Sequence, residues 1–202
     1  MKLPKSAILA ATGLLAACSA VPTHYYTLLP PPVAGTPAAP FQIEVQPVDV
    51  PAQVATPEMV VRAGDGEMVP VDTRRWIAPL GDEIRGALSA LLTQRLGARD
   101  VYGLPGAAAR AGAETYAVDV KVLRFESAPG AYARIDAVWA VRRVGDGAAA
   151  VVCSGSFEQP VAAGYEALAQ GHQKALSGLA DRVAAAVTAS RAAPAGALCP
   201  AG

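Results

Sequence analysis

The residue with the clearest chemistry in this sequence is Cys18, which ends the Leu-Ala-Ala-Cys motif of residues 15–18. Lys2 and Lys5 come before the motif, and an apolar run over residues 7–17 leads into it. A charged start, an apolar run of this length and small residues before a cleavage site are typical of a secretory signal. The run is shorter than the roughly 20 apolar residues that cross a bilayer as a helix.

The same motif fits the bacterial lipobox, in which the cysteine sulfur is diacylated, the peptide is cut before the cysteine, and the new amino group is acylated. Two or more acyl chains hold a protein stably on a membrane, whereas one chain, at ~0.8 kcal/mol per buried methylene, does so only marginally. Ser19 stands where an Asp would retain a Gram-negative lipoprotein at the inner membrane. The sequence therefore predicts lipidation of Cys18 and a lipid anchor on the periplasmic face of the outer membrane. The alternative is a secretory signal cut elsewhere.

Two further cysteines, Cys153 and Cys199, remain. The signal sends both to the oxidising periplasm, where two thiols commonly pair. A disulfide would close a loop of about 45 residues, attach the C-terminal tail to the sheet and stabilise the fold by ~3–4 kcal/mol in the chain-entropy model. The alternative is two unrelated thiols, with Cys153 buried in a strand. Their spacing matches neither a metal site nor a CxxC redox motif.

The rest of the sequence carries no recognisable catalytic group. Of its two histidines, His24 lies in the N-terminal segment and His172 on the apolar stripe of the last predicted helix. His172 is interpreted as a core residue, with a catalytic role as the alternative. Ser154-Gly155-Ser156 is similar to part of a serine-hydrolase motif, but it falls in a predicted strand beside no identifiable base. We therefore expect no enzyme, no metal and no cofactor apart from the covalent lipid.

The charge and composition narrow the remaining classes of partner. The 17 basic and 17 acidic side chains balance, and no basic patch stands out, so nucleic acid is not an expected partner.

The chain that remains after cleavage of the signal is long enough to form one domain with a hydrophobic core. Dense proline from Pro30 to Pro40 favours an extended tether between bilayer and domain. The predicted boundaries are residues 1–17 for the signal peptide, 18–40 for the lipidated cysteine and tether, 41–190 for the domain and 191–202 for a flexible tail.

The spacing of apolar residues predicts the strands and helices that position these side chains. Period-two alternation and turn signals predict strands at residues 25–29, 41–48, 59–62, 68–71, 116–126, 132–144 and 149–157. Helical spacing predicts one helix over residues 80–96, with acidic residues in its first turn and Gly97 beyond its end, and another over residues 164–190. The order of these elements predicts a single α+β domain, a mainly antiparallel sheet with two helices packed on one face.

Arg75 and Trp76 precede the first predicted helix. Trp76 is interpreted as a core residue where a strand enters the helix. The alternative is an interface residue, because Trp is enriched at binding hot spots.

Five segments of the sequence follow one another in a recognisable order. They are the lipobox, Tyr25-Tyr26-Thr27-Leu28, Val48-Asp49-Val50-Pro51, Pro57-Glu58-Met59-Val60-Val61-Arg62 and Arg75-Trp76-Ile77-Ala78-Pro79-Leu80. Together they resemble the PqiC-type lipoproteins, the ABC-type transport auxiliary lipoprotein family. The resemblance covers about residues 18–190, and one departure from it lies at residues 52–56, where relatives often carry an aromatic residue or Leu followed by Asp.

The resemblance implies a non-enzymatic role in lipid transport and envelope integrity. Such lipoproteins serve transporters whose MCE-domain protein forms a tunnel across the periplasm, powered by an inner-membrane permease and ATPase. The lipoprotein would receive the end of the tunnel at the outer membrane, in the form of a homo-oligomeric ring or otherwise. Three alternatives remain: a periplasmic lipid-binding carrier, a structural envelope lipoprotein, and a degenerate hydrolase that uses Ser154 or His172.

Overall fold

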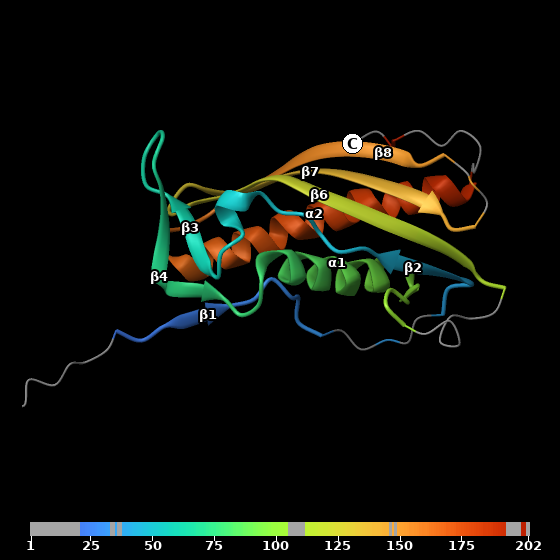
Figure 1. Cartoon of the computed structure of the whole chain (residues 1–202), viewed down its shortest axis with the longest axis horizontal. Helices are drawn as coiled ribbons and strands as arrows, with labels where there is room; N and C mark the ends of the chain where they lie inside the picture. Colours follow the sequence, from blue (N-terminus) through green and yellow to red (C-terminus); the bar gives the residue numbers. More distant parts are fainter. Residues whose placement is uncertain are drawn as a thin grey trace, which may run out of the picture.

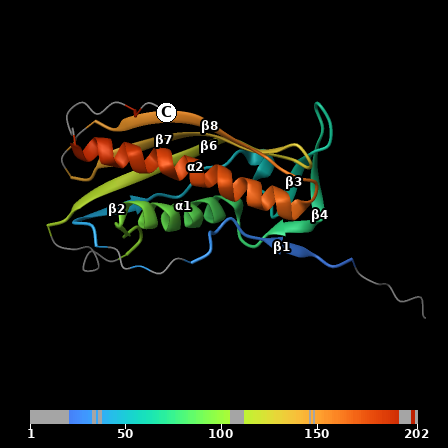
Figure 2. The same cartoon turned by 180° about the vertical axis from the view of Figure 1, so that it is seen from behind.

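The alternating and helical segments of the chain form two sheets and two long helices. The structure, a computed structural model, describes residues 21–32, 35, 38–104, 112–145, 147, 149–192 and 199–200. The helices lie side by side on one face of a five-stranded sheet, and a three-stranded sheet stands at one end (Figure 1; Figure 2). This arrangement confirms a single α+β domain with two helices on one face.

The five-stranded sheet has the order β5-β2-β6-β7-β8. Its long strands β6, β7 and β8 form an antiparallel meander, whereas the short β2 runs parallel to both β5 and β6. Side chains of β7 alternate between buried and partly exposed, because one face of the meander packs on the helices and the other faces solvent. The strand bounds are Arg99–Asp100 for β5, Phe41–Val45 for β2, Glu114–Ala128 for β6, Tyr132–Arg143 for β7 and Val151–Pro160 for β8.

The three-stranded sheet has the order β1-β4-β3, with β1 (His24–Tyr26) parallel to β4 (Met68–Trp76). β3 (Glu58–Arg62) pairs with β4 in an antiparallel hairpin, and a one-turn helix, Ala52–Val54, precedes β3. This hairpin projects at the left end of the molecule in Figure 1. The sheet contributes Met59, Val61 and Trp76 to the common core.

The helices α1 (Leu80–Leu96) and α2 (Tyr165–Ala192) bury their apolar stripes against each other and the sheet. α1 ends where Gly97 takes up a left-handed backbone with φ of 61°, which glycine adopts without a Cβ penalty. α2 runs close to β7, since a Cβ at Gly171 would overlap the side chains of Val161 and Ala133. Gly171 therefore sets how closely the long helix approaches the sheet.

Several predicted elements differ from the observed ones. β4 continues from the predicted end at residue 71 to Trp76, and the two-residue β5 was not predicted. The predicted single sheet is divided in two, because β1, β3 and β4 pair only with one another. β1 already belongs to the domain, so the proline tract that follows it connects β1 to β2 rather than the bilayer to the first strand.

At the C-terminal end, α2 extends to Ala192, inside the segment predicted as a flexible tail. Most of the remaining tail lies outside the described residues, as does much of the loop predicted at residues 103–112.

Candidate functional site

The segment that enters the domain from the N-terminal side is held by both helices. β1 pairs with the edge of β4, and Leu28, just beyond β1, is buried. The Thr27 hydroxyl and the Leu28 backbone N–H both donate to Oε2 of Glu83, at 2.8 and 2.7 Å. The Gln173 side chain of α2 donates to the Thr27 carbonyl oxygen at 3.0 Å. We call Thr27, Leu28, Glu83 and Gln173 the clasp.

Glu83 is only 2% exposed, although buried carboxylates are rare. Its position in the first turn of α1 places the carboxylate near the positive end of the helix dipole. Two donors from the N-terminal segment satisfy the same oxygen, as a buried charged group requires. The carboxylate therefore ties the start of the folded chain to the start of α1.

Glu83→Ala is expected to weaken the attachment of residues 24–28 by about 1–3 kcal/mol, because the buried Leu28 N–H loses its only described side-chain acceptor. The measurement is native-state hydrogen exchange at the backbone amides of Tyr26 and Leu28. Asp82→Ala is the matched control, since Asp82 lies in the same first turn but is exposed. Equal exchange in the two variants would contradict the assigned role of Glu83.

A second group of charged side chains lies where the small sheet meets β6. Arg62 contacts the Glu126 carboxylate at 2.6 Å, and the Tyr132 hydroxyl donates to the same oxygen. The Arg62 hydrogen bond is the main reason that the pKa of Glu126 falls to about 2, with further contributions from Tyr132 and Arg124. These residues border a cavity of about 270 Å³, which is lined by Pro51, Gln53, Val54, Arg62, Met68, Leu123, Arg124, Phe125 and Glu126.

The ion pairs continue across the exposed face of the meander. Arg124 contacts Asp136 at 3.2 Å, and Arg134 contacts both Asp136, at 2.9 Å, and Glu158, at 3.5 Å. Each of these charges has an opposite partner on the same or a neighbouring strand. The arrangement aligns β6, β7 and β8, and it offers no unpaired charge for acid–base chemistry within this group.

His172 is a core residue, as interpreted from the sequence. Its side chain is fully buried, its Nε2 lies 2.8 Å from the Ser127 hydroxyl oxygen, and its ring stacks on Phe125 at 3.9 Å between centroids. Burial lowers the pKa of His172 to about 3, so the ring is neutral near pH 7. Ser154 lies on the solvent side of β8, away from the helix-covered face that contains His172, so the structure does not bring the two together.

Trp76 is 3% exposed and contacts the rings of Phe125 and His172 edge-on. The structure therefore places Trp76 in the core rather than on an interface. Arg75, its neighbour, is partly exposed and pairs with Glu58 at 2.8 Å.

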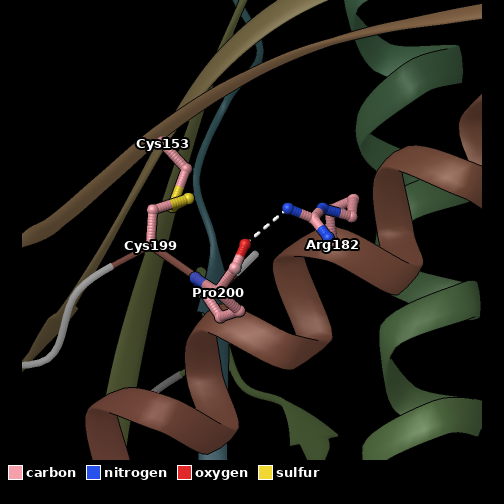
Figure 3. Close-up of a disulfide and its surroundings, with 4 residues drawn as sticks. All are labelled: Cys153, Arg182, Cys199 and Pro200. Atoms are coloured by element: carbon pink, nitrogen blue, oxygen red, sulfur yellow. Dashed lines mark hydrogen bonds between the residues drawn. A yellow bond between two sulfur atoms is a disulfide. The ribbon is translucent and has the colours of Figure 1, made fainter. Parts of the chain in front are cut away.

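Cys153 and Cys199 are bonded to each other, with Cα atoms 5.5 Å apart. The Arg182 side chain donates to the Pro200 carbonyl oxygen at 2.5 Å, so α2 also contacts the end of the chain (Figure 3). Cys18, the predicted lipidation site, lies outside the described residues.

Sequence reasoning missed the clasp. It interpreted Glu83 only as a favourable charge at the start of a helix. Glu83 lies next to the apolar stripe residues Leu80 and Ile84, and because carboxylates are rarely buried, an acidic residue in that position is a candidate for a specific hydrogen-bond partner. In the described part of the chain, no three metal-binding side chains gather into one site. Neither described helix combines the length and apolar character that a membrane span requires.

Comparisons with known proteins agree with this architecture. A Xanthomonas campestris protein of the DUF330 family superimposes with a TM-score of 0.60 at 16% identity, over 85% of this chain and 99% of that one. A crystal structure described as an uncharacterized protein gives a TM-score of 0.64 at 20% identity, over 83% of this chain and 99% of that one. At these identities the likeness shows a shared fold.

No curated protein matches the chain significantly. The family model described as the ABC-type transport auxiliary lipoprotein component matches residues 26–184, from β1 to the second half of α2. That range contains the clasp, the Arg62–Glu126 group and both sheets except the first two residues of β1. The chain therefore belongs to the family of ABC-type transport auxiliary lipoprotein components.

Proposed function

We propose that this protein is a non-catalytic docking subunit of a lipid transporter, anchored through Cys18 to the periplasmic face of the outer membrane. The periplasmic end of an MCE-domain tunnel protein would bind this domain, and an inner-membrane permease and ATPase would power the transport. The family membership supports service to an ABC-type transport system. The proposal adds three points to this: the partner is an MCE-domain protein, the anchor lies in the outer membrane, and copies of the domain assemble into a homo-oligomeric ring.

The observation that carries the proposal is the attachment of β1 to the domain. Only a few residues separate the predicted lipid on Cys18 from His24, and at ~3.5 Å per residue they span about 20 Å. The clasp then fixes the chain to both helices within the next few residues. A domain held this close to the bilayer suits a fixed receiving platform better than a mobile carrier.

Two cavities among the described residues are small. One cavity measures about 270 Å³, and another, on the exposed face near Asp119 and Lys121, measures about 220 Å³. Both are smaller than the roughly 300–1,000 Å³ of typical small-molecule pockets, and a phospholipid is larger than most such ligands.

In-cell photo-crosslinking of the full-length lipoprotein tests the proposal. The crosslinker replaces Asp65 at the hairpin tip, Leu104 after β5 or Ser154 on the outer face of β8, each of which is exposed. Val183, which is fully buried in α2, is the control position. We expect an exposed position, and not Val183, to capture an MCE-domain protein identified by mass spectrometry. Capture of lipid alone, or only of further copies of this chain, would favour the carrier or the structural role instead.

A further inference from the structure

The exposed face around β1 carries large apolar side chains. Val21 is 70% exposed, Tyr25 57%, Ile77 59% and Leu29 44%. We call these four residues the β1 patch. Isolated apolar residues are common on protein surfaces, whereas a group of them beside one strand marks an interaction site.

Backbone geometry accounts for the exposure of Tyr25. Within β1, Tyr26 faces the core and Tyr25 faces away from it. Beyond the strand Leu28 is buried, and the partly exposed Leu29 lies over Gly86 on α1. Tyr25 pairs in register with Arg75, and Tyr26 pairs with the buried Trp76.

Ile77 follows Trp76 directly, and its backbone N–H donates to the Tyr26 carbonyl oxygen at 2.9 Å. Ile77 therefore lies beside the end of β1, exposed on the surface while its neighbour Trp76 is in the core.

The length of chain before the β1 patch identifies what it faces. Val21 is three residues beyond Cys18, so at ~3.5 Å per residue it lies within about 10 Å of the predicted lipid-bearing sulfur. The headgroup layer on each side of a bilayer is about 5–8 Å thick, from a hydrocarbon core of ~30 Å within a total of ~40–45 Å. The start of the patch is thus kept at or just above the headgroup layer of the membrane.

We propose that the β1 patch rests on the phospholipid surface next to the anchor. This inference depends on the lipidation of Cys18 that the proposed function includes. Tyr25 has the amphipathic ring that favours the headgroup level, and Val21, Leu29 and Ile77 supply apolar area at its boundary with the acyl chains. Arg75 lies on the same face as Tyr25, where its charge is paired with Glu58.

Contact along β1 would fix how the whole domain stands on the bilayer. The clasp joins the residues directly after β1 to the first turn of α1 and to Gln173, in the third turn of α2, so β1 is tied to both helices. The lipid anchor then supplies attachment, and the β1 patch supplies orientation.

Spin labelling of the full-length, lipidated protein in vesicles of phosphatidylethanolamine and phosphatidylglycerol tests this inference. Ile77→Cys carries the label in one sample and Val152→Cys in the other. Val152 is the matched control, because it is also an aliphatic β-branched residue, is 62% exposed and lies on the outer face of β8. The measurement is the accessibility of the label to oxygen relative to a water-soluble nickel complex.

We expect the ratio of oxygen to nickel accessibility to shift upward at position 77 on vesicles and to stay at its aqueous value at position 152. Equal aqueous ratios, or an upward shift at position 152 alone, would overturn the inference. Val21→Cys provides a second label position outside the strand in case the Ile77 variant folds poorly. Mass spectrometry of the same samples separates two failures: an unlipidated Cys18 would overturn the proposed anchor as well, whereas a lipidated protein with an aqueous label would overturn only the contact of the patch.

Discussion

Acidification from pH 6.5 to pH 4.5 is expected to lower the free energy of unfolding by about 2–3 kcal/mol, at ~1.4 kcal/mol per pH unit for one proton. Burial lowers the pKa of His172 from 6.5 to about 3. Between these two values the unfolded chain binds a proton that the folded protein does not, so the folded state loses stability as the pH falls. The measurement is urea unfolding at a series of pH values.

The carboxylates act in a different pH window. Arg62 holds the pKa of Glu126 at about 2, below its usual 4.5, so the stability that this pair contributes is present above pH 4.5 and is lost only between about pH 4.5 and 2. The same sign applies to Glu58 and Asp136, whose pKa values are also lowered. The loss between pH 6.5 and 4.5 therefore reports mainly on His172.

His172→Gln is the matched control, because its amide can still hydrogen-bond to the Ser127 hydroxyl but takes up no proton. The variant is expected to be less stable at pH 7, since it loses the ring stacked on Phe125. Its free energy of unfolding should nevertheless change little between pH 6.5 and 4.5. A slope equal to that of the unchanged protein would show that another group titrates in this window.

Elements defined by local pattern could be predicted from the sequence. The bounds of α1 match the predicted residues 80–96, because the apolar stripe, the acidic first turn and Gly97 all lie within the element or next to it. The meander of β6, β7 and β8 could be predicted for the same reason, from alternation interrupted by turn residues. The core position of His172 followed from its place on the stripe of α2.

Features that depend on distant pairing could not be predicted in this way. Whether Phe41–Val45 pairs parallel to β6 depends on which strands meet in space, and no local signal encodes that choice. Arg99–Asp100 forms a strand only because β2 lies beside it. The clasp joins Leu28 to Glu83, 55 positions apart, so the burial of that carboxylate becomes understandable only once both ends are placed.

Loss of the Cys153–Cys199 disulfide is expected to reduce the free energy of unfolding by about 4 kcal/mol. The bond spans 46 positions, and the chain-entropy model assigns about this value to a loop of that length. Cys199→Ala is the suitable variant, because Cys199 is exposed while the remaining Cys153 thiol can stay buried as a small apolar group. The measurement is the urea midpoint, with the unfolding slope checked for two-state behaviour.

Reductant provides the control for this prediction. A thiol reductant should lower the midpoint of the unchanged protein toward that of Cys199→Ala and should leave the variant unaffected. If the stabilisation acts mainly on the unfolded chain, the buried amides of β7 and α2 should keep their order of hydrogen-exchange protection while all lose stability by a similar amount. A loss confined to the end of α2, where Arg182 contacts Pro200, would show instead that the bond only fastens the tail to the folded domain. The two outcomes therefore distinguish a disulfide that stabilises the whole domain from one that only attaches the C-terminal tail to it.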